Sequence, residues 1–243
     1  ETARCRPDCF NTESARLATR APRAEPMSPR DIETVRASLD RGIAFLLETQ
    51  NANGSWGSSY PKAANVLAPA PGAHRAFKVG TTALCVMALA EAGGDRVAVD
   101  LALLRARDFL FNELPKLRRD DPETVYCVWG HAYSIQALVA LRERYAFDTD
   151  TLAEVDRLIA DQLRMLDRTQ SVHGGWGYYT WSSGMTSRPS LFPTSFTTAT
   201  AMVSLHVAQE AGYDVSPRMV KLGMAGLAKA RLPDFAYGYY ILP

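Results

Sequence analysis

The sequence predicts an all-α fold, an array of helical hairpins, and two observations lead to this prediction. The first is a duplication: residues 50–57 return as residues 170–177, shifted by 120 positions without a gap. The second is that the apolar residues before each copy return at the same shift. These residues are Ile32, Val35, Leu39, Ile43 and Leu46 in the first copy and Leu152, Val155, Ile159, Leu163 and Leu166 in the second. Their spacing is that of one buried stripe on an amphipathic helix, so a helix and its following turn occur twice and indicate a helical repeat.

Two weaker copies extend the repeat. Residues 105–110 repeat the pattern of residues 41–46. Residues 222–227 carry a further copy, and Tyr237, which follows it, falls where Trp56 does. The four repeat starts, Gly42, Ala106, Gln162 and Gly223, are 64, 56 and 61 residues apart. A unit of this size holds two helices and their connections.

Uncharged segments alternate with amphipathic, charge-rich segments along the chain. The uncharged segments are residues 79–90, 124–141 and 189–209. The amphipathic segments are residues 29–49, 97–114, 152–169 and 217–231. The alternation predicts two layers: inner helices nearly inaccessible to water, notably 124–141 and 193–209, and outer helices that expose one charged face. We therefore expect about seven main helices.

The starts of the outer helices carry capping residues. Ser28 and Ser216 each precede a proline, which places a capping hydroxyl before a first-turn Pro. Residues 151–154, with the sequence Thr-Leu-Ala-Glu, have the pattern of a capping box. These positions predict where three of the outer helices begin.

Composition and charge exclude two classes of interaction. The chain is 47% hydrophobic and 22% charged, as globular proteins are, and its formal net charge is +1. Because the basic residues are scattered and no nucleic-acid-binding or phosphate-loop motif occurs, we predict no nucleic-acid partner. We also predict no transmembrane segment, since His131, Ser134 and Gln136 at the centre of residues 124–141 would be costly in lipid.

The first part of the chain differs from the rest. Residues 1–27 are rich in Arg, Ala and Pro and show no helical stripe, so we expect an extended N-terminal arm followed by a repeat domain over residues 28–243. Cys5 and Cys9 have a spacing that fits either a disulfide of an exported protein or two unpaired thiols. The first alternative favours an exported or periplasmic protein, although the sequence does not decide the localisation.

The turn after the first amphipathic segment resembles a known motif. The residues that carry the resemblance are Arg41, Phe45, Gln50, Gly54 and Trp56. Their order is similar to the QW motif of squalene-hopene and oxidosqualene cyclases, within the prenyltransferase and terpene-cyclase α/α toroid superfamily. The second copy keeps Gln170, Gly174 and Trp176 but has Asp161 and Met165 at the basic and aromatic positions.

The resemblance covers about residues 29–240 and implies an α/α toroid, a ring of six helical hairpins with a pocket at the ends of the inner helices. In that family the motif ends an outer helix, and its Gln and Trp tie this end to the neighbouring hairpin. Because the two copies are related by a 120-residue shift without a gap, we expect Trp56 and Trp176 to occupy equivalent positions, each just after an outer helix and packed against the next hairpin. The chain holds four outer and three inner segments. We expect an incomplete toroid-like ring, completed by residues beyond Pro243, by residues 1–27 or by another protein.

Two sets of residues partly match catalytic motifs of that superfamily, and for both we prefer a structural interpretation. Residues 147–151 come nearest to the Asp-x-Asp-Asp acid of the cyclases but lack the second adjacent Asp, and an acidic turn before an outer helix is expected as a cap. Protein prenyltransferases of the superfamily need a zinc site built from Asp, Cys and His. Cys127 and His131 are one helical turn apart and could share a metal, but no acidic residue is near them in the sequence. We therefore predict no metal and no cofactor, and we assign no catalytic residue.

Aromatic residues favour a binding function. The connections after Trp56 and Trp176 carry several, and residues 124–141 carry more. The candidate ligand-binding residues are Tyr60, Tyr126, Trp129, His131, Tyr133, Tyr178, Tyr179 and Trp181. Aromatic walls with a few polar tips suit an apolar ligand such as an isoprenoid or another lipid. The alternative is that these side chains fill the centre of the ring and brace its loops.

Two hypotheses for the function follow. The first is a non-catalytic toroid-like scaffold or binding module, with other protein subunits or an apolar small molecule as partners. The second is a terpene cyclase or prenyltransferase whose catalytic residues lie beyond the chain. The incomplete catalytic motifs favour the first.

Overall fold

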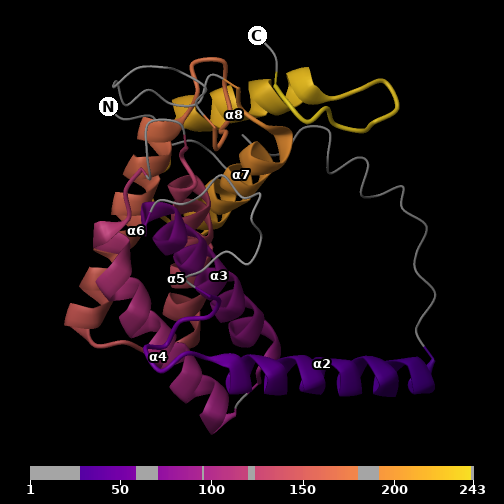
Figure 1. Ribbon diagram of the computed structural model, residues 1–243, viewed down its shortest axis with the longest axis vertical. Coiled ribbons are helices and arrows are strands. Elements are labelled where there is room, and N and C mark those ends of the chain that lie inside the picture. The colour runs from indigo at the N-terminus through magenta and orange to yellow at the C-terminus, as the bar shows by residue number, and fades with distance from the viewer. Residues whose placement is uncertain (1–27, 59–70, 95, 120–123, 180–191, 242–243) are drawn as a thin grey trace.

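The computed structural model describes residues 28–58, 71–94, 96–119, 124–179 and 192–241 (Figure 1). Helices make up 71% of these residues and no strand occurs among them, so the predicted all-α class is confirmed. The helices in this part of the chain are α2 (Pro29–Thr49), α3 (Pro71–Ala92), α4 (Val97–Glu113), α5 (Cys127–Arg144), α6 (Thr149–Thr169), α7 (Ser195–Glu210) and α8 (Pro217–Ala230). The expected N-terminal arm, residues 1–27, lies outside the described residues.

The helices pack in two groups. Helices α3, α5 and α7, which contain the uncharged segments, lie side by side, with α5 between the other two, and we call them the inner helices. Each inner helix carries the amphipathic helix that follows it in the chain: α4 packs on α3, α6 on α5 and α8 on α7. Amphipathic helices cover the inner ones because each has one apolar stripe to bury.

The expected burial of the inner helices is confirmed for α5 and wrong for α7. No residue of the segment 124–141 is exposed. In α7, however, Phe196 is 42% and Val203 50% exposed. The difference follows from position, since α5 has an inner helix on both sides and α7 packs against α5 alone within this layer.

Two of the three predicted caps lie where the sequence places them. The Ser28 hydroxyl accepts a hydrogen bond from the Asp31 amide at 3.2 Å, and the Ser216 hydroxyl accepts one from the Met219 amide at 3.4 Å. The predicted capping box at residues 151–154 is wrong. Asp148 caps α6 instead, because its carboxylate accepts from the Thr151 amide at 2.9 Å.

The duplicated turn has the same contacts in both copies. The indole nitrogens of Trp56 and Trp176 donate to the carbonyls of Leu46 and Leu166, at 2.7 and 2.8 Å. Their backbone amides donate to threonine hydroxyls of the following inner helices, Thr82 at 3.0 Å and Thr198 at 2.9 Å. The two tryptophans therefore occupy equivalent positions, as predicted.

The glutamine of each copy ties the turn to the next outer helix. The Gln50 amide donates to the Ala102 carbonyl of α4 at 2.8 Å, and the Gln170 amide donates to the Met219 carbonyl of α8 at 2.7 Å. Each bond satisfies the glutamine amide nitrogen and joins two outer helices that are not consecutive in the chain. The repeat is thus held together by the same side chain at two junctions.

The third turn keeps the backbone of the motif and loses its side-chain contacts. Phe235 lies at the position of Gly54 and Gly174 and also has a positive φ, 69° against 84° and 85°. Tyr237, however, is 53% exposed, so its expected equivalence with Trp56 fails for the side chain. Trp176 is buried because it lies against Gly223 of the next outer helix, α8. No described helix follows the third turn, so Tyr237 has no such helix to pack against.

Helix α2 departs from the prediction for an outer helix. Figure 1 shows it extending away from the other helices, with only its C-terminal end against them. Ile43 is its one buried residue among those described. The helix therefore exposes its apolar stripe as well as its charged face, because no inner helix precedes it in the described part of the chain.

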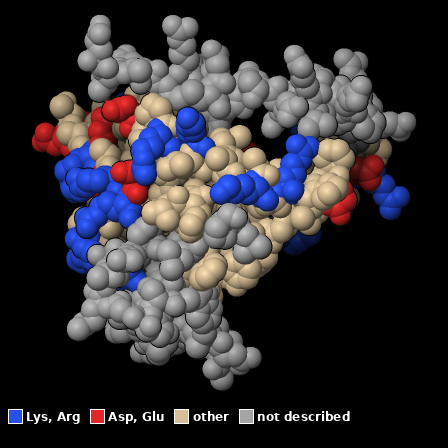
Figure 2. Space-filling view, turned by 90° about the horizontal axis from the view of Figure 1, so that it is seen from above, with Lys and Arg blue, Asp and Glu red and all other residues tan. Residues whose placement is uncertain are grey.

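Helix α8 forms a basic edge of the molecule. Its exposed side chains include Arg218, Lys221 and Lys229, and it contains no acidic residue. Figure 2 looks down on this side and shows Lys and Arg side chains among uncharged residues, with Asp and Glu also present on the same face. Within the described residues, no helix has the length and apolar character needed to cross a membrane.

Candidate functional site

The three inner helices run in the same direction. Residues near the C-terminal ends of all three line one hollow, among them Ala90 of α3, Ala140 of α5 and Val207 of α7. At the opposite end, aromatic side chains at their starts contact one another. The inner layer thus has an aromatic end and a hollow end.

Each inner helix presents a column of residues spaced by seven. Residues seven apart lie on nearly the same side of an α-helix because they are two turns apart. The columns are Phe77, Leu84 and Glu91 in α3; Trp129, Gln136 and Glu143 in α5; and Phe196, Val203 and Glu210 in α7. Each column begins with an aromatic residue and ends with a glutamate at the hollow. The shared order shows that the inner helices present one continuous surface, which we call the inner face.

An aromatic cluster forms at the first end of the inner face. Its members are Phe77, Tyr126, Trp129, Tyr178, Tyr179, Phe196, Tyr239 and Tyr240. The ring centroids of Trp129 and Tyr178 are 4.9 Å apart, and those of Phe77 and Tyr126 are 5.0 Å apart. Such distances lie in the range where aromatic rings attract one another beyond their buried area.

Backbone hydrogen bonds bring the loop tyrosines to this end. The Val125 amide donates to the Tyr178 carbonyl at 2.8 Å, and the Ser195 amide donates to the Tyr239 carbonyl at 3.0 Å. Each bond joins the segment after an outer-helix turn to the start of the preceding inner helix. The two loop segments therefore repeat one contact across the starts of α5 and α7.

Phenol groups within the cluster bond to one another. The Tyr126 hydroxyl donates to the Tyr179 hydroxyl at 3.0 Å, and the hydroxyls of Tyr178 and Tyr239 are also hydrogen-bonded. Burial, followed by the bond to Tyr239, raises the pKa of Tyr178 above its usual value. Tyr178 therefore stays neutral at physiological pH, and the hydrogen bonds between these phenols satisfy their polar atoms.

Exposure within the cluster is graded. Tyr126 is buried, Trp129, Tyr178 and Tyr179 are half-buried, and Phe196 and Tyr239 are exposed. The buried members brace the loops against the inner helices. The exposed members continue into the apolar side chains of Leu84 and Val203, which are also exposed.

The hollow at the other end has a volume of about 630 Å³. Met87, Ala90, Val139, Ala140 and Val207 form its apolar lining. Glu91, Glu143 and Glu210 at its rim are exposed. Together with the negative ends of three helix dipoles, these carboxylates make the hollow unfavourable for an anion.

The cation beside the hollow, Arg144, is engaged elsewhere. Its guanidinium donates to the Asp100 carboxylate at 3.0 Å and to the Ala90 carbonyl at 3.2 Å. Hydrogen bonds from Tyr145 and then Arg144 lower the pKa of Asp100. The Arg144 charge is therefore neutralised within an ion pair that ties α5 to α4.

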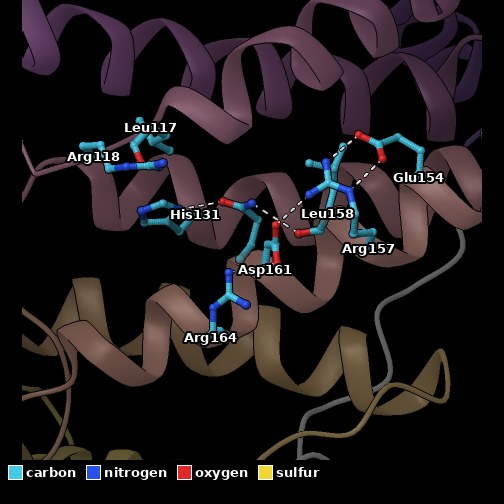
Figure 3. A network of polar contacts seen from close by, with 9 residues as sticks. Leu117, Arg118, His131, Glu154, Arg157, Leu158, Asp161 and Arg164 are labelled. Atoms are coloured by element: carbon cyan, nitrogen blue, oxygen red, sulfur yellow. Dashed lines mark hydrogen bonds and ion pairs between the residues drawn. The ribbon is translucent and has the colours of Figure 1, made fainter.

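His131, a candidate ligand-binding residue, faces away from the inner face. Its Nδ1 lies 2.6 Å from the Gln162 amide oxygen of α6, and the Gln162 amide nitrogen donates to the Leu158 carbonyl at 3.2 Å (Figure 3). Because an amide oxygen only accepts, Nδ1 carries the proton. Burial is the main reason that the pKa of His131 falls to about 4, so the imidazole is neutral at pH 7.

The other candidates divide into three groups. Tyr126, Trp129, Tyr178 and Tyr179 come together in the aromatic cluster. Tyr133 lies on α5 at its contact with Gly80 of α3. Tyr60 and Trp181 lie outside the described residues. Among the residues that are described, no three His, Cys, Asp or Glu side chains are close enough to share a metal ion.

Sequence reasoning missed four members of the cluster: Phe77, Phe196, Tyr239 and Tyr240. Tyr239 and Tyr240 could have been predicted from the repeat, because its 61-residue step places them at the positions of Tyr178 and Tyr179. Phe77 and Phe196 lie outside the duplicated motif, and only the packing of α3 and α7 on α5 brings them to it.

No family model, no curated protein and no solved structure matches the chain. The class of protein that its fold defines is an all-α helical repeat with an aromatic-lined inner face.

Proposed function

We propose that the chain is a non-catalytic binding module that holds an elongated apolar molecule, of isoprenoid or similar lipid character, along its inner face. One observation carries the proposal: the exposed side chains of Phe196, Val203 and Leu84 continue from the aromatic cluster toward the hollow. Exposed apolar side chains that group on one surface of a folded protein often mark a place of interaction. Aromatic rings at one end supply a large contact area with little loss of side-chain entropy.

The charges at the hollow narrow the ligand class. Glu91, Glu143 and Glu210 surround it, and Arg144 is already paired with Asp100. A molecule with a neutral or cationic head suits this end, whereas a diphosphate or carboxylate head meets repulsion. The proposed ligand is therefore an apolar chain with an uncharged or basic end.

Polar groups near the inner face have structural roles that support binding over catalysis. The phenols of the cluster bond to each other, and Gln136 donates to the Ser204 hydroxyl of α7 at 2.8 Å. Burial raises the pKa of Cys85 to about 11, which keeps this thiol protonated and weakly nucleophilic at neutral pH.

The wider architecture of the proposal is toroid-like. The equivalent contacts of Gln50 and Gln170, and of Trp56 and Trp176, support the resemblance to the prenyltransferase and squalene-cyclase superfamily. On this proposal the inner face is the wall of the central pocket, and α3 and α7 are its open edges.

Fluorescence of a neutral apolar probe, N-phenyl-1-naphthylamine, tests the proposed binding. We expect its emission to rise with the full chain and to fall when geranylgeraniol is added as a competitor. Geranylgeranyl diphosphate should compete at least about tenfold less well, because its charge meets the three glutamates. Equal competition by both compounds would contradict the assignment of the hollow end.

A pair of matched variants locates the site. Val203→Asp places a charge on the inner face and should weaken probe binding at least about tenfold. Val97→Asp makes the same change at an exposed valine of the outer helix α4 and should leave binding unchanged. If the two variants bind the probe equally well, the inner face is not the binding surface.

A further inference from the structure

The exposed stripe of α2 has an internal reference in the same molecule. Val35 is 51% and Leu39 46% exposed, whereas their counterparts 120 residues later, Val155 and Ile159 of α6, are fully buried. The stripes share their spacing and their residue types. What differs is the covering element, since α6 lies against α5 and no described inner helix precedes α2.

The same comparison shows an empty position opposite the stripe. Gln162 of α6 meets His131 of α5, while its counterpart in α2, Gly42, has open space where a side chain would project. A helix that lay on α2 as α5 lies on α6 would fill this space. Because Gly42 has no side chain, the residue of the covering helix that lies opposite it could be larger than His131, which lies opposite Gln162.

The inner helices of this chain cannot be that covering helix in a second copy. Each of them already carries the outer helix that follows it, α4 on α3, α6 on α5 and α8 on α7. The place that α2 would take on an inner helix is therefore occupied in every copy.

Residues 1–27 also lack the composition of an inner helix. They include nine charged residues, with no uncharged run longer than four, whereas residues 124–141 contain no charge. Burying such charges against an apolar stripe without partners would be costly.

Charge at the edge of the stripe indicates the chemistry of the occupant. Arg142 near the end of α5 pairs with Asp156 of α6 at 3.2 Å. The counterpart of Asp156 in α2 is Arg36, which is exposed. A helix that covers α2 in the same geometry would therefore need an acidic residue where α5 has Arg142.

We propose that the stripe of Ile32, Val35 and Leu39 on α2 is a docking surface for one helix of a partner, which lies antiparallel to α2 and is uncharged except for an acidic residue opposite Arg36. The contact of α5 with α6 defines its geometry, since residues early in α5 meet residues late in α6. The surface is separate from the inner face, so this proposal does not depend on the proposed ligand.

A labelled peptide tests the proposal on the full chain by fluorescence anisotropy. The probe has the sequence of residues 124–144 with the change Arg142→Glu and a lysine tail for solubility, and the unchanged sequence with the same tail is its comparison. We expect the changed peptide to bind more tightly. In the Arg36→Glu variant the unchanged peptide should instead bind more tightly than the changed one. A contact that depends on apolar side chains alone would not produce this reversal.

Two variants of α2 localise the contact. Leu39→Asp should weaken binding of the changed peptide at least about tenfold, because it puts a charge at the centre of the stripe. Phe45→Asp is the matched control, since Phe45 is exposed on the same helix but off the stripe. Both positions are exposed, so circular dichroism should show that both variants remain folded.

Four outcomes would overturn the proposal. The first is no binding of the changed peptide to the unaltered chain, and the second is equal binding by Leu39→Asp and Phe45→Asp. A dimer of the chain that Leu39→Asp dissociates in sedimentation would assign the stripe to a second copy. A gain in peptide binding after removal of residues 1–27 would assign it to the chain's own segment.

Discussion

Gly54 lies so close to the Arg105 carbonyl of α4 that a Cβ atom at residue 54 would be 2.2 Å from the carbonyl oxygen. Gly174 has the same relation to the Leu222 carbonyl of α8, at 2.3 Å, and both glycines have a positive φ. The glycines of the repeated turn are therefore required by backbone conformation and by the approach of the next outer helix.

We expect Gly54→Ala and Gly174→Ala each to lower the free energy of unfolding by about 2 to 4 kcal/mol, since both strain and overlap must be relieved. Urea denaturation followed by circular dichroism measures this loss. Gly42→Ala is the control, because Gly42 is helical and has nothing within 4 Å of its Cβ position. A loss at Gly42 as large as at Gly54 would show that the close approach is not the cause.

Replacing Trp176 by Phe should lower the free energy of unfolding by about 2 to 3 kcal/mol. The change removes the bond to the Leu166 carbonyl and leaves a void in a fully buried site. Tyr237→Phe, at the third copy of the turn, should change stability by less than about 0.5 kcal/mol, because Tyr237 is exposed. Similar losses at the two positions would contradict the finding that the third turn has lost its packing.

Burial of His131 makes stability depend on pH in a defined window. The pKa of His131 is about 4 in the folded chain and has an ordinary value of 6.5. Between these values the unfolded chain binds a proton that the folded chain does not, so stability falls as pH decreases from about 6.5 toward 4. Above pH 6.5 both states are neutral and this dependence vanishes.

The variant His131→Leu tests that dependence by urea denaturation at pH 7 and pH 5. We expect the unaltered chain to lose about 1 to 2 kcal/mol more than the variant between the two values. Parallel losses in the two proteins would mean that His131 gains its proton in the folded state as readily as in the unfolded state.

Phe235→Gly should raise the free energy of unfolding, by up to about 1 kcal/mol. Phe235 has a φ of 69°, which a side chain disfavours, and its ring is exposed. Loss of its contact with the Arg231 guanidinium, 4.9 Å from the ring centroid, offsets part of the gain. Leu232→Gly, three residues earlier and without a positive φ, should instead be destabilising.

Local spacing determined much of the fold in advance. The apolar stripes, the Ser28 and Ser216 caps and the equivalence of Trp56 with Trp176 follow from patterns within one helix and one turn. Such patterns depend on backbone periodicity, which acts over a few residues. Asp148 rather than Thr151 caps α6 because several residues in a row can cap, and the end of the preceding connection decides among them.

Tertiary packing decided which of these patterns are buried and which side chains meet. Val35 and Val155 occupy the same place in the same stripe, yet one is exposed and the other buried, because burial depends on α5, which lies against only one of them. His131 and Trp129 are two residues apart on α5, yet one bonds to Gln162 of α6 and the other joins Tyr178 and Phe196 at the inner face. The absence of charge in residues 124–141 predicts that α5 is buried. Only the placement of the neighbouring helices shows which residues each side of α5 contacts.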